Sequence, residues 1–229
     1  MEKISVILLA AGKSKRFKHS TKKQFIKIKN KLLLEYVIDK FITLKYPKQI
    51  ILVIDKNDIK KVENLHFKKE YKDIKIVFGG KERYDSVFNA SKYVDKDAKI
   101  VLIHDIARPL ISKNLIYKCI KKIKNYDCVI PVIPIVDTIK LINSKYEIIR
   151  TQSRENLVLA QTPQVFKKKV FDHIYSKNVL YKWIKKNKIT DDSQIAELEG
   201  YKVKGIIGEK TNIKLTTKED LYLLKTFVN

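Results

Sequence analysis

The sequence predicts an α/β protein with a mostly parallel, Rossmann-like sheet flanked by helices. Over the first 132 residues, short runs of Ile, Val and Leu alternate with amphipathic stretches of helical period, a pattern typical of β-α units in a parallel sheet. The chain has 229 residues, 45% of them hydrophobic, which is enough for one sizeable core. We therefore expect a single domain over residues 1–229, with ligands at the carboxyl ends of the strands.

Each element is expected from its period, which is two residues in a strand and about 3.6 in a helix. Runs of β-branched residues predict strands at 5–9, 50–54, 74–78, 100–104 and 128–132. Apolar residues recurring at helical spacing predict helices between them at 32–44, 86–93 and 114–123. Helical pattern returns at 169–186 and 192–199, and it is followed by a strand at 202–207 and a closing helix at 218–228.

Residues 134–160 break the alternation of strands and helices. This stretch contains prolines and alternating residues, including V-D-T-I-K-L-I and Y-E-I-I-R, which suit a β-hairpin arm better than another strand-helix unit. A protruding arm generally has a partner. We therefore expect residues 134–160 to form a dimerisation arm that pairs with the same arm of a second subunit in a homodimer.

The formal net charge of +24 makes nucleic-acid binding a rival function. The excess is almost all lysine and is spread along the chain, and no motif for nucleic-acid readout is present. No specific nucleic-acid partner is therefore expected. Arginine is scarce in this lysine-rich chain. An arginine that is nevertheless present indicates a need for its planar, bidentate guanidinium, which binds phosphate or carboxylate, although Arg150 could also be present by chance. The arginines are Arg16, Arg83, Arg108, Arg150 and Arg154.

The sequence favours a cytoplasmic protein that does not bind membranes. The early apolar run at residues 4–11 is far shorter than the ~18 residues that span a bilayer, and acidic Glu2 stands where a signal peptide is basic. Cys119 and Cys128 lack C-x-x-C spacing and a nearby histidine, so neither a disulfide framework nor a zinc site is expected.

The first strand runs into a turn of small residues, L-L-A-A-G-K-S-K-R-F at 8–17. The backbone N–H groups of Ala10, Ala11 and Gly12, together with the cations Arg16 and Lys23, are suited to cradle a triphosphate. A P-loop is excluded because its first glycine would stand five positions before Gly12, at an isoleucine. A tight strand-to-helix turn with solvated lysines is the structural alternative.

A second loop, G-G-K-E-R-Y-D-S-V, follows the strand at 74–78. Gly80 permits close backbone approach, and it is followed by Arg83 and by the Ser86 hydroxyl at a helix start. Backbone and hydroxyl groups there can read a planar edge such as that of a base. The alternative is a plain turn with a helix cap from Asp85 or Ser86.

A third motif, H-D-I-A-R-P, begins at the end of the strand at 100–104. Asp105 there is placed to hold Mg²⁺ against phosphate oxygens, because hard cations take oxygen ligands. The alternatives are a salt bridge from Asp105 to Arg108 or a helix cap, and His104 is interpreted as a packed core residue.

The ordered motifs give the chain a resemblance to a known family. They are L-A-A-G-x-x-x-R, K-Q-F, G-G-x-x-R-x-x-S-V, H-D-x-A-R-P, D-T-I-K, Q-T-P-Q-x-F, T-D-D and N-I-K-L-T. This set resembles the 2-C-methyl-D-erythritol 4-phosphate cytidylyltransferases of non-mevalonate isoprenoid synthesis over nearly the whole chain. The resemblance implies a single nucleotidyltransferase domain of the nucleotide-diphospho-sugar transferase type, CTP and a sugar-alcohol phosphate as substrates, and Mg²⁺ or another divalent cation.

The resemblance also implies roles for individual residues. Cytosine would be recognised by Ala10, Gly80 and Ser86, while Arg16, Lys23 and Lys214 would surround the triphosphate and act in catalysis. Asp105 would bind the metal with the nucleotide. The acceptor would be held by Arg108, Thr138, Arg154, Thr162 and Thr190. The acceptor phosphate is already a nucleophile, so positioning and electrostatics suffice for in-line attack on the α-phosphorus of CTP.

The chain departs from the family pattern at three positions. Lys22 replaces a common proline, Ser14 a common glycine, and Lys81 a frequent acidic residue, which leaves the shape of the nucleotide loops open. Ribitol-5-phosphate cytidylyltransferase shares the loops and Q-T-P-Q and is the alternative activity. Some relatives carry a fused cyclodiphosphate-forming domain, whereas this chain ends at Asn229 and only the transferase is expected.

Overall fold

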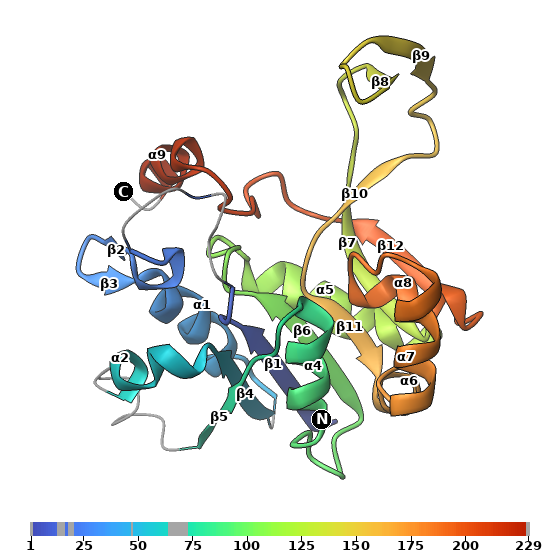
Figure 1. Ribbon diagram of the computed structural model, residues 1–229. Coiled ribbons are helices and arrows are strands. Elements are labelled where there is room, and N and C mark those ends of the chain that lie inside the picture. Colours follow the sequence, from blue (N-terminus) through green and yellow to red (C-terminus); the bar gives the residue numbers. More distant parts are fainter. Residues whose placement is uncertain (1, 13–16, 18–20, 47, 64–72, 228–229) are drawn as a thin grey trace.

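The computed structural model describes residues 2–12, 17, 21–46, 48–63 and 73–227, so Ser14 and Arg16 lie outside the described residues. Its centre is an eight-stranded sheet of order β10-β7-β11-β6-β1-β4-β5, with β12 paired to β7 (Figure 1). Helices cover both faces, which confirms the predicted α/β class. The strands of this sheet are β1 (Ile4–Leu9), β4 (Lys48–Ile54), β5 (Ile74–Phe78), β6 (Ile100–Asp105), β7 (Cys128–Pro134), β10 (Val158–Ala160), β11 (Gln164–Lys167) and β12 (Val203–Ile207).

The helices divide between the two faces because side chains alternate along each strand. In β1, Val6 and Leu8 join one buried cluster, while Ile7 joins the other. The first cluster packs under α1 (Leu33–Ile42), α2 (Ile59–Glu63), α5 (Lys113–Lys122) and α9 (Lys218–Phe227). The second packs under α4 (Arg83–Ser91), α6 (Lys168–Ile174), α7 (Lys177–Lys186) and α8 (Asp192–Leu198).

Four neighbouring strands, from β6 to the edge strand β5, run parallel to one another. β1 pairs in parallel with both β4 and β6, and β4 pairs in parallel with β5. The carboxyl ends of these strands therefore share one edge, and the loops that leave this edge carry the predicted motifs. Pairing of Leu9 with Asp105 places the first loop beside the H-D-I-A-R-P motif.

β11 is a strand that the sequence analysis did not anticipate. It lies antiparallel between β6 and β7, with Val165 opposite both Leu102 and Val129. Its four residues are too few to show a period, and they overlap the Q-T-P-Q-x-F motif. β11 thereby brings this motif into the centre of the sheet.

Two helices differ by more than two residues from the expected bounds. The stretch expected as one helix at 169–186 is divided into α6 and α7, and between them the buried Tyr175 donates its hydroxyl to the buried Asp192. α4 begins three residues earlier than expected, at Arg83. Its first turn is closed by Asp85, whose carboxylate accepts the N–H of Glu82 at 3.0 Å.

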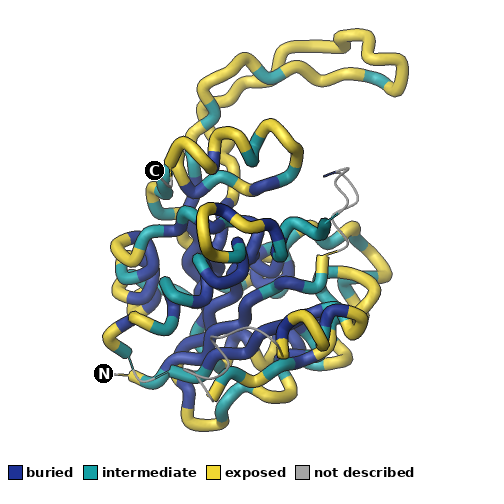
Figure 2. Tube along the Cα trace, turned by 90° about the vertical axis from the view of Figure 1, so that its left-hand side faces the viewer, coloured by how far each residue is buried: buried dark blue, intermediate teal, exposed yellow. Residues whose placement is uncertain are grey.

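The stretch 134–160 contains a hairpin that protrudes from the body (Figure 1). It is formed by β8 (Ile139–Ile142) and β9 (Ile148–Gln152), while the flanking β10 pairs with β7 in the central sheet. Figure 2 shows that nearly all of the hairpin is exposed, in contrast to the buried strands of the body. A smaller antiparallel pair, β2 (Lys27–Ile28) and β3 (Lys31–Leu32), precedes α1.

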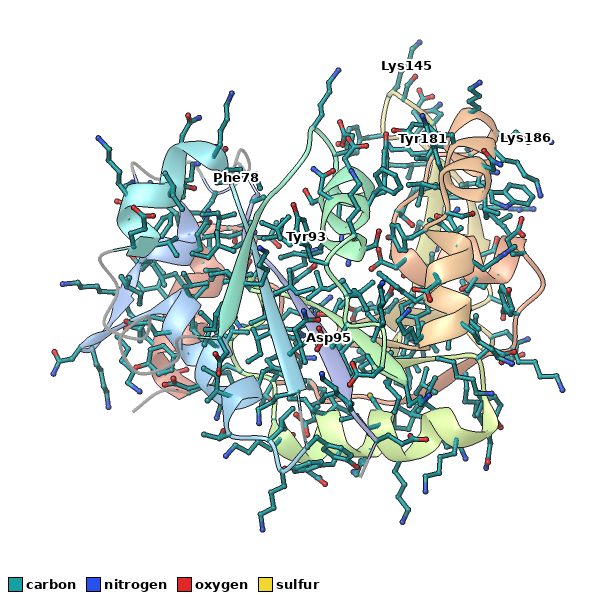
Figure 3. All side chains as sticks on the ribbon, turned by 90° about the horizontal axis from the view of Figure 1, so that it is seen from below. Phe78, Tyr93, Asp95, Lys145, Tyr181 and Lys186 are labelled. Carbon is teal, nitrogen blue, oxygen red and sulfur yellow. The ribbon has the colours of Figure 1, made fainter. Side chains whose placement is uncertain are left out.

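The lysines are dispersed over the surface. Figure 3 shows Lys145, on the protruding hairpin, and Lys186, at the end of α7, extending away from the ribbon at separate places. Among the described residues, no helix is long and apolar enough to cross a membrane.

Candidate active site

A cavity of about 650 Å³ opens at the carboxyl ends of β1, β4, β5 and β6. It is lined by the first loop, the glycine loop after β5, the end of β6 and Lys214. The described residues that line it are Leu9, Ala10, Ala11, Gly12, Lys23, Gln24, Asp55, Lys56, Asn57, Gly79, Gly80, Lys81, Glu82, Arg83, Ser86, Asp105, Ile106, Ala107 and Lys214. The tertiary structure thus brings the three loop motifs into one site.

The first loop and the glycine loop are packed against each other. A Cβ added to Gly79 would lie 2.4 Å from the Cβ of Ala11 and 2.9 Å from Oγ of Ser86. The contact therefore requires a small residue on the first loop and glycine on the second. Ala10 is held in place from two sides, because its N–H donates to the Val53 carbonyl at 2.7 Å and its carbonyl accepts from Gln24 at 2.8 Å.

Ser86 shapes the glycine loop from the first turns of α4. Its Oγ accepts the N–H of Gly80 at 3.1 Å and donates to the carbonyl of Glu82 at 3.2 Å. A Cβ at Gly80 would lie 2.3 Å from the Cβ of Asp85, so close backbone packing explains this glycine too. The helix-capping alternative therefore describes real contacts in this structure, and they build the wall of the cavity.

The lysines at 22 and 23 point in different directions. Lys23 lines the cavity, and its Nζ donates to the carbonyl of Leu215 at 3.1 Å. Lys22 pairs with Asp58 at 2.8 Å and Asp55 at 3.3 Å. Lys22 thus fastens the segment before Lys23 to the turn after β4.

Asp105 ends β6 between two cations. Its Oδ2 lies 2.6 Å from Nζ of Lys214, and its Oδ1 lies 3.4 Å from Nε of Arg83. Burial alone would raise the pKa of Asp105, but the charges of Arg83 and Lys214 outweigh it and hold this pKa well below its usual range. Asp105 is therefore an ionised carboxylate at neutral pH.

The carboxylate of Asp105 fits a divalent cation that takes most of its ligands from a substrate. Among the described residues, no group of three or more His, Cys, Asp or Glu side chains could hold a metal ion. Oxygen donors suit Mg²⁺, which commonly binds through one or two carboxylates plus phosphate oxygens. The donor set here is compatible with that mode of binding and not with a metal caged by protein alone.

Thr162 and His104 support Asp105 from behind. Oγ1 of Thr162 accepts the backbone N–H of Asp105 at 3.2 Å and lies 2.9 Å from Nδ1 of His104, while Nε2 of His104 lies 3.1 Å from the carbonyl of Arg108. A carbonyl only accepts, so Nε2 carries the proton and Nδ1 accepts from Thr162. Burial lowers the pKa of His104 to about 4. The histidine is a neutral core residue, as expected.

Arg108 does not form the salt bridge with Asp105 that was the alternative interpretation of that aspartate. Its Nη1 donates to the carbonyl of Asn212 at 2.8 Å and its Nη2 to that of Ala160 at 3.3 Å. Its Nε is buried without a hydrogen-bond partner among the described residues. Burial lowers the pKa of Arg108, and its guanidinium retains donor capacity beside the site.

The two glutamines of Q-T-P-Q each hold a different site segment. Gln161 donates to the carbonyls of Glu209 at 2.9 Å and Asn212 at 3.2 Å, in the loop that leads to Lys214. Gln164 accepts the N–H groups of Asp192 at 3.0 Å and Ser193 at 2.9 Å, at the start of α8. The motif is therefore a scaffold, and its role was not anticipated from the sequence although its letters were noted.

None of the five predicted acceptor residues is among the described residues that line this cavity. Arg108 and Thr162 lie next to its lining, through the contacts given above, whereas the other three lie on exposed segments. Thr138 and Arg154 are exposed and flank the hairpin, where the Arg154 guanidinium donates to the carbonyl of Val136. Thr190 is exposed just before α8 and donates to Gln194 through its N–H and its hydroxyl. Their predicted roles need a partner or a substrate to bring them to the site.

Arg83 lines the cavity, and its guanidinium pairs with two carboxylates. Its Nη1 lies 2.6 Å from Oδ2 of the buried Asp192, and its Nε faces Asp105. The letters R-x-x-S-V and T-D-D marked both ends of this pair in the sequence. Nothing in the local pattern, however, indicated that the two residues meet.

Comparison with known proteins agrees with the motifs. The family model described as IspD: 2-C-methyl-D-erythritol 4-phosphate cytidylyltransferase matches residues 4–229. A relative of that name from Clostridium botulinum (strain Loch Maree / Type A3) is 42% identical over 226 residues, covering 97% of this chain and 96% of the relative. One from Caldanaerobacter subterraneus subsp. tengcongensis is 37% identical, with 98% of both chains covered.

Solved structures are similar over the same length. The 4-diphosphocytidyl-2C-methyl-D-erythritol synthase of Anaerococcus prevotii has a TM-score of 0.83 and 31% identity, covering 99% of this chain and 96% of that one. The bifunctional IspDF of Campylobacter jejuni has a TM-score of 0.79 and 31% identity, covering 96% of this chain and 53% of that one. Since the family model and the relatives cover nearly the whole sequence, this chain belongs to the IspD family of 2-C-methyl-D-erythritol 4-phosphate cytidylyltransferases.

Proposed function

We propose that this chain transfers CMP from CTP to 2-C-methyl-D-erythritol 4-phosphate and releases pyrophosphate. The observation that carries the proposal is the cavity in which the two small-residue loops, Lys23, Lys214 and the ionised Asp105 meet. The loops supply backbone groups for a nucleotide, and the cations supply charge for its phosphates. Family membership supports cytidine as the base and methylerythritol phosphate as the acceptor.

The reaction is an in-line displacement. An oxygen of the acceptor phosphate attacks the α-phosphorus of CTP, a new P–O bond forms, and the bond to the pyrophosphate oxygen breaks. Lys23, Lys214 and Arg16 offset the charge that gathers on the transferred and departing phosphates. A charge-assisted hydrogen bond is worth ~1.5–3 kcal/mol, so each cation contributes roughly ten- to a hundredfold in rate.

Asp105 holds the divalent cation in this proposal. When bound, Mg²⁺ supplies charge neutralisation on the phosphate oxygens. The protein keeps the carboxylate ionised and fixes its backbone through Thr162. Lys214, now 2.6 Å from the carboxylate, is placed to exchange that contact for a phosphate oxygen.

The hairpin arm completes the acceptor side in a homodimer. Large apolar side chains on the arm are exposed, including Val136 at 66%, Tyr146 at 83% and Ile148 at 65%, and a partner would cover them. In an isologous dimer each arm reaches the site of the other subunit, so Thr138 and Arg154 would hold the acceptor there. Arg108, Thr162 and Thr190 would act from the subunit that binds the nucleotide.

The test is a pyrophosphate-release assay with purified protein, Mg²⁺, each of the four nucleoside triphosphates, and either methylerythritol phosphate or ribitol 5-phosphate. CTP with methylerythritol phosphate should give the fastest release, and removal of Mg²⁺ by chelation should stop it. Faster release with ribitol 5-phosphate would identify the alternative acceptor. Absence of release, together with sub-micromolar binding of nucleic acid at physiological salt, would replace the enzyme by a nucleic-acid-binding protein.

A further inference from the structure

Arg83 connects the two halves of the site through a set of partly buried charges. Its side chain starts at the first residue of α4, directly after the glycine loop that lines the nucleotide cavity. One end of the guanidinium contacts Asp105, and the other contacts Asp192 at the first residue of α8. The side chain of Asp192 is 1% exposed, and its second oxygen accepts from the hydroxyl of Tyr175.

Burying these charges costs free energy, which suggests that the arrangement serves a function. Asp192 is removed from water and Asp105 largely so, while Arg83 keeps 28% of its side chain exposed. A buried ion pair is often no more stabilising than apolar residues of the same size. Nearly all basic residues of the chain are lysines. Of the 49 lysines and arginines taken together, only five are arginines. A planar fork with donors on two edges reaches Asp105 and Asp192 together, which the single ammonium of lysine does not.

The segment that Asp192 begins carries a predicted acceptor residue. Thr190 precedes α8, and Asp191 caps the helix by accepting the N–H of Gln194 at 3.0 Å. Gln164 holds the start of α8 from β11, within the sheet. Arg83 is the contact that ties the same helix start to the glycine loop and to Asp105 on the nucleotide side.

We propose that Arg83 is a positioning residue that, through Asp192, sets the start of α8 and thereby Thr190 relative to the bound nucleotide. The proposal rests on the proposed cytidylyl transfer for the identity of the two substrates. Binding of CTP at the glycine loop fixes the position of the start of α4, and the Arg83–Asp192 pair transmits that position to the acceptor-binding segment. The expected consequence is that loss of the pair weakens acceptor use more than nucleotide use.

Asp192→Asn tests the pair without touching the nucleotide side. The substitution keeps size and removes the charge, and Asp192 is not among the described residues that line the cavity. The acceptor KM should rise roughly ten- to a hundredfold, the loss expected from a misplacement of about 1 Å, while the CTP KM stays within about twofold. Arg83→Lys should raise the acceptor KM similarly and also lower kcat, because Arg83 contacts Asp105.

The double variant tests whether the two substitutions remove the same interaction or act independently. Combining Arg83→Lys with Asp192→Asn should raise the acceptor KM little beyond the single variants, because both remove one interaction. Tyr175→Phe is the matched control, since it removes a buried hydrogen bond to Asp192 and leaves the ion pair. It should lower the unfolding temperature with both KM values within about twofold of wild type.

Hydrogen exchange provides a readout that does not depend on activity. In the absence of substrates, the amides at the start of α8 should exchange faster in Asp192→Asn and Arg83→Lys than in wild type, and CTP should slow them in wild type alone. Equal rises in both KM values, multiplicative effects in the double variant, or unchanged exchange at α8 would overturn the positioning role. An inactive wild type with the expected exchange would instead refute the proposed substrates.

Discussion

Replacing Thr162 by valine should destabilise the protein by removing one hydroxyl from beneath the active site. Valine has nearly the shape of threonine, so packing is conserved while two hydrogen bonds are lost. The N–H of Asp105, 3.2 Å from Oγ1, loses its acceptor, and Nδ1 of His104, 2.9 Å away, loses its donor. Both partners are buried, and Thr162 itself is 5% exposed, so water does not replace the hydroxyl.

The expected loss follows from these two orphaned groups. Leaving one buried donor or acceptor unpaired costs about 1–3 kcal/mol, so the two orphaned groups of Thr162→Val should together lower the unfolding free energy by about 2–6 kcal/mol. For a domain of this size, that corresponds to an unfolding temperature lower by about 4–24 °C. Turnover should also fall, because the backbone of Asp105 is no longer fixed at the end of β6.

Urea denaturation followed by circular dichroism measures the effect, with Thr162→Ser as the matched control. Serine keeps the hydroxyl and loses a methyl group, so it should cost about 1 kcal/mol. The slope of free energy against urea should be the same in all three proteins, which shows that the midpoint reports stability. Equal midpoints for the valine and serine variants would refute the assignment of the hydroxyl as a bridge.

Three further predictions concern other parts of the site. Gly79→Ala places a methyl group 2.4 Å from the Cβ of Ala11. The CTP KM should therefore rise at least about tenfold, and the unfolding free energy should fall by about 1–3 kcal/mol. An unchanged CTP KM would show that the two loops move apart without affecting the site. Burial lowers the pKa of His104 from 6.5 to about 4, so the unfolded chain binds a proton first as pH falls. Up to about 3 kcal/mol of stability should be lost between pH 6.5 and pH 4, and NMR should show the ring neutral at pH 5.5; a ring charged at that pH contradicts this. Mixing Arg154→Ala with Lys23→Ala subunits should restore up to about half of the native sites per heterodimer; subunits that exchange but stay inactive would place Arg154 outside the partner's site.

Much of the fold could be predicted because it follows from local pattern. The strand at 5–9 and the helix at 114–123 are visible from side-chain periods of two and about 3.6 residues, which neighbours in the chain impose on each other. The structure places β1 at Ile4–Leu9 and α5 at Lys113–Lys122, within a residue of those bounds. β11 was missed because four residues carry no period and its place is decided by β6 and β7.

Part of the candidate site could be predicted for a different reason. The carboxyl ends of parallel strands meet at one edge of a sheet, so motifs that follow such strands converge. Gly80, Ser86 and Asp105 therefore line one cavity, as expected from their places in the sequence. The partners of these residues were not predictable, and Asp105 contacts Arg83 and Lys214 where Arg108 was the alternative.

The sequence by itself determined the α/β class, the loops that carry the chemistry and the family motifs, since each depends on residues close together in the chain. The tertiary structure decided which charges meet. Lys214 and Asp105 are 109 residues apart, and Arg83 reaches Asp192 because β11 holds the start of α8 near the end of β6. Such contacts depend on strand order and packing, which sum weak interactions over the whole chain, so no local pattern specifies them.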